Sequence, residues 1–226
     1  MLFFHGCNLR CPWCHNPELL DFNTFPESQD SLSFMDCISY LEKRRNVIDA
    51  VVISGGEPCL NEELPLQIAV LKKMCMSVKL DTNGMFPEMI SRLMENSDNC
   101  PDYIALDMKL SPSRYMELLP YPDKTNFNPC EKLKQSAALL YNSPVLHEYR
   151  TLILPNNMIN ENDIEELSSL VDDSPWSFRL FKGGKCLDPV LNNIKTNKWA
   201  EIEKGELLIS KAKSLGKNAF SHFHSP

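Results

Sequence analysis

Short apolar runs alternate with amphipathic segments along the whole chain of 226 residues. Runs rich in β-branched and aromatic residues predict strands at residues 2–4, 50–53, 77–80, 103–106, 147–154 and 176–181. Apolar residues at helical spacing predict helices between them, at residues 34–45, 61–74, 87–96, 112–119, 129–141 and 161–171. A longer polar helix is expected at about residues 196–215. The pattern indicates repeated strand–helix units.

Strands that alternate with helices predict an α/β fold with a parallel sheet and right-handed crossovers. An open doubly wound sheet and a barrel both have this pattern. Six units are too few for an eight-stranded barrel, so we expect an incomplete (β/α)6 TIM-like barrel. The length fits a single domain over residues 1–226, with a core at about 1–185 and a helical extension at about 186–226.

Polar or glycine-rich clusters follow several of the predicted strands. They are the loop at residues 7–14, Gly55-Gly56-Glu57-Pro58, Asp81-Thr82-Asn83, and Asp107 with Lys109. In parallel α/β folds, ligands bind at the carboxyl ends of the strands. We therefore expect these clusters to face one common mouth.

Three cysteines, Cys7, Cys11 and Cys14, form a C-x3-C-x2-C loop after the first predicted strand. Thiolates this close suit zinc or an iron–sulfur cluster. Three protein ligands leave one iron of a cubane open, whereas structural zinc takes four protein ligands and His15 would supply the fourth. The loop alone leaves both metals open. The other cysteines are scattered and predict no second cluster.

The remaining clusters have both a ligand-binding and a structural interpretation. The two glycines let the backbone approach a ligand closely, but a plain tight turn has the same pattern. Asp81, Thr82 and Asn83, together with Asp107, suit ribose hydroxyls or a hard cation. The same residue types form turn and helix-cap hydrogen bonds about as often.

Two basic residues accompany these clusters. Lys109 lies two positions after Asp107, where a solvated ion pair would stabilise the fold very little. Arg150 lies inside an apolar strand, where an unpaired charge is costly. We therefore expect Arg150 either to face the mouth or to have a buried partner.

Composition and charge narrow the class of protein. The net charge of −7 argues against a general nucleic-acid binder, and no apolar run is long enough for a transmembrane helix. The N-terminus lacks the features of a signal peptide. Nine cysteines, with three in one loop, fit a metal site in a reducing compartment better than a disulfide framework. We expect a cytoplasmic protein with no membrane or nucleic-acid partner.

The cysteine loop and the GGEP segment together resemble two motifs of the radical S-adenosylmethionine (radical SAM) superfamily. Its signature is C-x3-C-x2-C with an aromatic residue before the third cysteine, here Trp13. Further segments resemble activating enzymes of glycyl-radical enzymes, at residues 6–19, 80–84, 106–109 and 149–151. Among these enzymes, the short activating proteins of anaerobic ribonucleoside-triphosphate reductases match best. Pyruvate formate-lyase activating enzymes are the next most similar.

The resemblance implies two cofactors and a role for each cluster. Cys7, Cys11 and Cys14 are the implied ligands of a [4Fe–4S] cluster, whose open iron is chelated by SAM. The implied SAM-binding residues are Trp13, Gly55, Gly56, Glu57, Asp81, Asn83, Lys109 and Arg150. A competing set, for the monovalent-cation site of the pyruvate formate-lyase branch, is Asp81, Thr82 and Asp107. The two roles of Asp81 compete.

The resemblance also implies a reaction and its partners. SAM is cleaved reductively, and a glycyl radical forms on a partner enzyme, in the best match an anaerobic ribonucleoside-triphosphate reductase. A flavodoxin or ferredoxin is the expected electron donor. The alternatives are a pyruvate formate-lyase-type activating enzyme, another radical SAM enzyme acting on a small molecule, and a zinc or electron-transfer protein without catalysis.

Two departures from the resemblance bear on these implications. No histidine follows the sixth predicted strand, where the sequence is Phe181-Lys182-Gly183-Gly184. Its absence favours the reductase-activating interpretation over the pyruvate formate-lyase type. The chain also opens inside the first predicted strand, so we expect either a misassigned start or a missing N-terminal segment.

Overall fold

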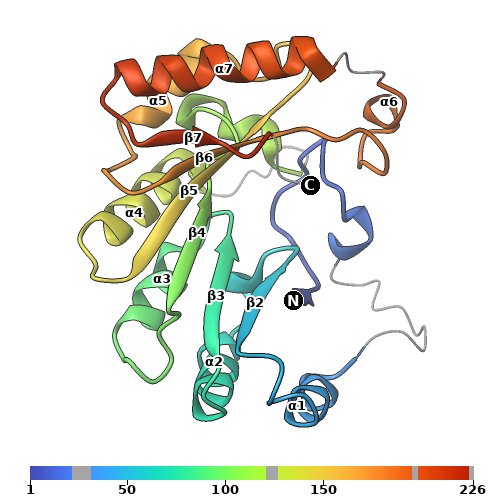
Figure 1. The fold of residues 1–226 in the computed structure, drawn as a ribbon, viewed down its shortest axis with the longest axis vertical. Coiled ribbons are helices and arrows are strands. Elements are labelled where there is room, and N and C mark those ends of the chain that lie inside the picture. Colours follow the sequence, from blue (N-terminus) through green and yellow to red (C-terminus); the bar gives the residue numbers. More distant parts are fainter. Residues whose placement is uncertain (22–31, 121–126, 195–197, 224–226) are drawn as a thin grey trace.

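One parallel sheet, with its strands in the order of the sequence, forms the framework of the fold (Figure 1). The computed structural model describes residues 1–21, 32–120, 127–194 and 198–223. The strands are β1 (Leu2–Phe4), β2 (Ala50–Gly55), β3 (Ser77–Thr82), β4 (Tyr103–Asp107), β5 (Leu146–Ile153), β6 (Trp176–Leu180) and β7 (Ala219–Ser221). Strands β1 and β7 are the two edges of the sheet. The sheet is therefore an incomplete barrel, as the sequence predicts.

Helices connect the strands and lie along the outside of the sheet (Figure 1). The α-helices are α1 (Phe34–Glu42), α2 (Leu64–Lys73), α3 (Pro87–Met94), α4 (Pro129–Tyr141), α5 (Glu161–Ser168), α6 (Pro189–Asn192) and α7 (Lys198–Ser214). Short 3-10 helices are η1 (Pro17–Leu19), η2 (Pro58–Leu60) and η3 (Pro112–Leu118). None of the helices in the described ranges is both long and apolar enough to cross a lipid bilayer.

Local sequence sets where several helices begin. Ser33 and Asp36 form a reciprocal capping box at α1, with hydrogen bonds of 3.1 and 3.0 Å. Asn160 and Asp163 form a second capping box at α5. Each box satisfies backbone N–H groups that a free helix end leaves unpaired. Local sequence therefore determines where α1 and α5 begin.

A seventh strand in the C-terminal segment departs from the predicted helical extension. Strand β7 pairs in parallel with β6, and the N–H of Trp176 donates to the carbonyl of Asn218 at 2.9 Å. The N–H of His222 donates to Phe178 at 3.0 Å, and the ring of Phe223 is buried. A run of three residues is too short to show strand periodicity, which is why the sequence pattern did not predict it.

Candidate functional site

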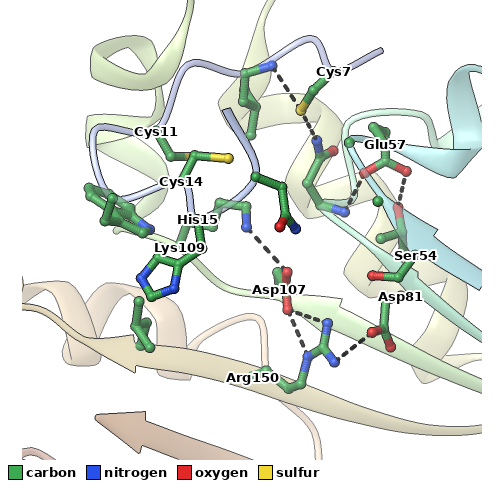
Figure 2. Close-up of a pocket in the computed structure, with 18 of the residues that line it drawn as sticks. Cys7, Cys11, Cys14, His15, Ser54, Glu57, Asp81, Asp107, Lys109 and Arg150 are labelled. Atoms are coloured by element: carbon green, nitrogen blue, oxygen red, sulfur yellow. Dashed lines mark hydrogen bonds and ion pairs between the residues drawn. The ribbon is translucent and has the colours of Figure 1, made fainter. Parts of the chain in front are cut away.

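A cavity of about 420 Å³ opens at the carboxyl ends of the strands, on the side of the N-terminal segment (Figure 2). All of the predicted site residues line it, namely Cys7, Cys11, Trp13, Cys14, Gly55, Gly56, Glu57, Asp81, Thr82, Asn83, Asp107, Lys109 and Arg150. They come from loops and strand ends that lie far apart in the sequence. The predicted common mouth is therefore present.

Backbone hydrogen bonds hold the cysteine loop against three other parts of the chain. Arg10 N donates to Leu118 O of η3 at 2.7 Å, and Glu57 N donates to Gly6 O at 2.7 Å. On the other side, Leu187 N donates to Cys14 O at 3.0 Å. The loop is thereby fixed between η3, the GGEP segment and the segment after β6.

Two thiols of the loop, those of Cys7 and Cys11, belong to buried residues. Burial raises the pKa of Cys7 to about 11 and that of Cys11 to about 12. The thiols of Cys7 and Cys11 are therefore protonated at neutral pH, and metal binding must displace these two protons. Among the described residues, no three His, Cys, Asp or Glu side chains come together to hold a single metal ion. The zinc alternative gains no support from this geometry.

Gly56 lets two loops approach each other. A Cβ at this position would lie 2.1 Å from Gly6 O and 3.0 Å from Leu19 O, both backbone atoms. Gly55 has φ +124°, in the region that favours glycine. The pair of glycines thus joins the end of β2 to the start of the cysteine loop, a structural role that the sequence pattern did not reveal.

The carboxylate of Glu57 fastens the GGEP segment to the end of β3. It accepts hydrogen bonds from the Thr82 hydroxyl at 2.7 Å, from Asn83 N at 2.7 Å and from Cys59 N at 3.0 Å. The side chain is 1% exposed, and burial raises its pKa despite these donors. Both oxygens of the Glu57 carboxylate already accept hydrogen bonds within the protein. The GGEP segment can therefore offer its backbone groups, rather than this carboxylate, to a ligand.

An ionic cluster forms the opposite wall of the cavity (Figure 2). The Arg150 guanidinium bridges two carboxylates, with Nη1 3.0 Å from Asp81 Oδ2 and Nη2 2.7 Å from Asp107 Oδ1. Lys109 Nζ lies 3.2 Å from Asp107 Oδ2. Burial alone would raise the pKa of Asp107, but the two cations outweigh it and hold that pKa at about 2. Arg150 therefore both faces the mouth and has buried partners, and Lys109 is more than a solvated ion pair.

The side chains expected at a monovalent-cation site, Asp81, Thr82 and Asp107, are engaged by other groups of the protein. The Thr82 hydroxyl donates to Glu57, while Asp81 and Asp107 both bind Arg150. The guanidinium lies between the two carboxylates and supplies the positive charge that a cation would bring.

One basic residue of the cavity wall, Arg179, was not predicted. Arg179 on β6 is paired in register with Leu152, so it points to the same side of the sheet as Arg150. A basic residue between Phe178 and Leu180 at a strand end was the signal that could have revealed it. His15 packs edge-on against Phe181 with ring centroids 5.6 Å apart. Arg179 comes from β6, whereas His15 belongs to the cysteine loop and packs against the residue that follows β6.

The donor set fits an iron–sulfur cluster with a polar ligand beside it. Three thiols suit iron, and the ionic wall offers an ammonium and a guanidinium to a carboxylate. One buried polar atom of a cavity-lining residue, Asp81 Oδ1, has no hydrogen-bond partner among the described residues. Such atoms are rare in folded proteins unless a ligand or water satisfies them.

A sequence profile of the radical SAM superfamily matches residues 1–168. The chain therefore belongs to this superfamily and is a radical SAM enzyme, with a [4Fe–4S] cluster and SAM as its cofactors. The relatives give finer detail. A protein of Methanocaldococcus jannaschii, "Putative glycyl-radical enzyme activating enzyme MJ1227", is 32% identical over 207 residues, which cover 90% of this chain and 81% of that protein.

Two further proteins are similar over different lengths. The pyruvate formate-lyase-activating enzyme of Listeria monocytogenes is 32% identical over 127 residues, covering 52% of this chain and 50% of that enzyme. The structure of Streptococcus suis SuiB bound to S-adenosylmethionine superposes with a TM-score of 0.67 at 14% identity, covering 97% of this chain and 49% of SuiB. The matched part is about half the length of each. The likeness to SuiB concerns the fold alone.

Proposed function

We propose that this enzyme generates a glycyl radical on a partner protein by reductive cleavage of SAM. The observation that carries the proposal is one cavity with three cysteines on one wall and an ionic cluster on the other. The relative from Methanocaldococcus jannaschii, which this chain matches over 90% of its own length, supports glycyl-radical activation in particular. No side-chain acid or base is needed for this chemistry.

The residues have distinct proposed tasks. Cys7, Cys11 and Cys14 hold three irons of the cluster and leave the fourth open to SAM. When bound, the cluster and SAM supply the electron transfer and the hydrogen-atom abstraction. Lys109 and Arg150 bind and orient the methionyl carboxylate, which their charge and position opposite the cysteine loop favour.

The remaining residues orient SAM and shield the site from water. The backbone of residues 55–57 faces the methionyl amino group, because the Glu57 carboxylate is occupied. Asn83 donates to Asn8 Oδ1 at 2.9 Å and lies 3.9 Å from Cys7 Sγ, where it would lie beside the cluster and SAM. Asp81 orients Arg150. Trp13, which is buried, excludes water beside the cluster.

The proposed partner is an anaerobic ribonucleoside-triphosphate reductase. The support is the motif resemblance and the residues after β6, where Phe181 and Lys182 stand in place of a histidine. A flavodoxin or ferredoxin is the proposed electron donor. The cytoplasm is the proposed location, because a reducing compartment keeps the cysteines available for the cluster.

Anaerobic reconstitution with iron and sulfide, followed by incubation with SAM and dithionite, tests the function. We expect a glycyl-radical signal in electron paramagnetic resonance when the reductase is present, with methionine and 5′-deoxyadenosine formed in step. A reductase with alanine in place of its radical glycine is the matched control and gives no such signal. A glycyl-radical signal that forms on pyruvate formate-lyase but not on the reductase would identify pyruvate formate-lyase as the partner instead. Cleavage that requires only a small molecule would overturn glycyl-radical activation.

A further inference from the structure

Six charged side chains of alternating sign form a continuous chain inside the barrel, from its floor to the cavity. In spatial order they are Glu148, Lys79, Asp81, Arg150, Asp107 and Lys109. The interior of a TIM-type barrel is usually filled by bulky apolar side chains. A charge chain in this place requires pairing at every step, since unpaired buried charges are costly.

The register of three strands explains how the charge chain forms. Asp81 of β3, Ala105 of β4 and Glu148 of β5 are register partners across the sheet. Strands β3 and β5 are separated by two strand spacings, roughly 10 Å. Ala105 carries only a methyl group, so the longer side chains of β3 and β5 reach over it and meet. The contact between Lys79 and Glu148 thus crosses β4 between Ala105, the register partner of Glu148, and Tyr103, whose ring centroid lies 5.0 Å from Lys79 Nζ.

Lys79 lies between two carboxylates that compete for it. Its Nζ is 2.8 Å from Glu148 Oε1 but 3.9 Å from Asp81 Oδ1. Asp81 Oδ1 has no hydrogen-bond partner among the described residues, whereas Asp81 Oδ2 pairs with Arg150 at 3.0 Å. Glu148 thus draws Lys79 away from Asp81. Asp81 is left to bind Arg150 on the cavity side.

We propose that Lys79 and Glu148 are positioning residues that set how firmly Asp81 holds Arg150, and thereby how the site binds SAM. Neither residue lines the cavity, so neither touches the ligand. The inference rests on the proposed role of Arg150 in binding SAM. It adds that Lys79 and Glu148, at the floor of the barrel, influence how Arg150 is held.

The charges of Lys79 and Glu148 have opposite effects on Asp81. Variants of the two residues can therefore distinguish their contributions. In Glu148→Gln, Lys79 loses its closer partner and turns to Asp81, where it competes with Arg150. In Lys79→Met, Glu148 and Asp81 remain as neighbouring buried carboxylates with one cation fewer, and Arg150 is drawn towards the floor. In the double variant both charges are gone, and the upper four members of the charge chain keep their pairing.

Equilibrium binding of SAM to the cluster-loaded full chain tests this, together with iron content and the thermal midpoint. We expect each single variant to weaken SAM binding by about tenfold with iron content unchanged, and the double variant to return to within about threefold of the parent. Lys79→Arg keeps the charge and should bind SAM as the parent does. In reductive cleavage of SAM without a partner protein, KM should rise with kcat nearly constant.

The matched control is Lys72→Met, which removes a similar ion pair with Asp102 at 3.0 Å, remote from the cavity. It should leave SAM binding unchanged. Single variants that bind SAM normally, or a double variant whose loss equals the sum of the single losses, would overturn the inference. If Lys79→Met does not fold, Glu148→Gln against the double variant carries the same test.

Arg150→Met separates this inference from the proposal beneath it. If that variant binds SAM normally, the role of Arg150 fails and the positioning role falls with it. If Arg150→Met weakens binding while the Lys79 and Glu148 variants do not, only the positioning role is overturned. Because SAM binding is measured without a partner protein, neither result depends on which glycyl-radical enzyme is activated.

Discussion

The two walls of the cavity differ in how far the polypeptide alone completes them. On the ionic wall, formed by Asp81, Asp107, Lys109 and Arg150, each charge lies within 3.2 Å of an opposite charge. On the thiol wall, formed by Cys7, Cys11 and Cys14, the nearest hydrogen bond to a sulfur is Leu9 N to Cys7 Sγ at 3.5 Å. Folding preorganises the ionic wall, whereas the thiol wall is completed by its cofactor.

The largest expected effect is on the thiol wall. Cys11→Ser removes one of the three proposed cluster ligands, so we expect the protein to hold far fewer than the roughly four irons of a cubane and to lose absorbance near 400 nm and SAM cleavage. The free energy of unfolding of the metal-free variant should differ from that of the metal-free parent by only about 1 kcal/mol, because the buried thiol behaves as a small apolar group.

Cys75→Ser is the matched control, because Cys75 is exposed and lies outside the cavity. This variant should load iron and cleave SAM like the parent chain. A Cys11→Ser protein that keeps its full iron content would contradict the assignment of the thiol wall. A Cys11→Ser protein that fails to fold without metal would show that the thiol wall, like the ionic wall, contributes to folding of the polypeptide.

On the ionic wall we expect a large loss of stability with cluster loading retained, the reverse of the pattern on the thiol wall. Arg150→Met leaves Asp81 and Asp107 without their shared partner, although Lys79 and Lys109 remain near them. We expect the free energy of unfolding to fall by about 3 kcal/mol, at the lower end for a broken buried ion pair. Cluster loading of the folded protein should be retained. Urea unfolding and iron analysis measure the two quantities.

Arg92→Met provides the comparison for this change. Arg92 pairs with Glu62 at 3.3 Å, and both side chains are mostly exposed. An exposed pair of this kind stabilises a protein by less than about 1 kcal/mol. If Arg150→Met unfolds no more easily than Arg92→Met, the ionic wall is not preorganised by folding and the contrast between the walls is lost.

A smaller effect is expected where the GGEP segment meets the cysteine loop. In Gly56→Ala, the added Cβ would meet the backbone of Gly6 at 2.1 Å, so one segment must move. We expect a loss of about 1–3 kcal/mol in unfolding free energy, together with slower cluster loading. Gly216→Ala is the control, since it adds only the strain of φ +79° in open space. Equal effects of the two substitutions would show that the junction tolerates displacement.

The site could be located from the sequence because its residues follow strand ends. A parallel sheet brings the carboxyl ends of its strands to one edge, so the cysteine loop, residues 55–58 and Asp107 had to converge. Spacing within the cysteine loop indicated soft-metal ligands without any knowledge of the fold. These inferences needed only local pattern and the direction of the chain.

Pairing within the site could not be predicted in the same way. The link between Asp81 and Arg150 crosses β4, and it depends on the register of three strands and on the small Ala105. Likewise, nothing in the sequence shows that the Glu57 carboxylate is used by Thr82 and Asn83. These contacts arise from tertiary geometry, which periodicity and motifs do not encode.

The last expected effect depends on pH and is a difference in acid stability between the walls. The pKa of Asp107 is held at about 2, below its ordinary value of 3.8, so the unfolded chain binds its proton first as pH falls. Stability from this group is fully present above about pH 4 and is lost as pH falls towards 2. Asp107→Asn should therefore unfold more easily than the parent by about 2 kcal/mol at pH 6, with the gap closing near pH 2.

Urea unfolding of both metal-free proteins from pH 6 to pH 2 measures this gap, and Asp98→Asn, at an exposed position, serves as the control with little gap at any pH. The buried thiols do not ionise in this range, because the pKa values of Cys7 and Cys11 lie near 11 and 12. An acid-dependent gap for Asp107→Asn therefore reports on the ionic wall alone. A gap that stays constant down to pH 2 would mean that the carboxylate is not held by Arg150 and Lys109 in the absence of cofactors, and that both walls await their ligands.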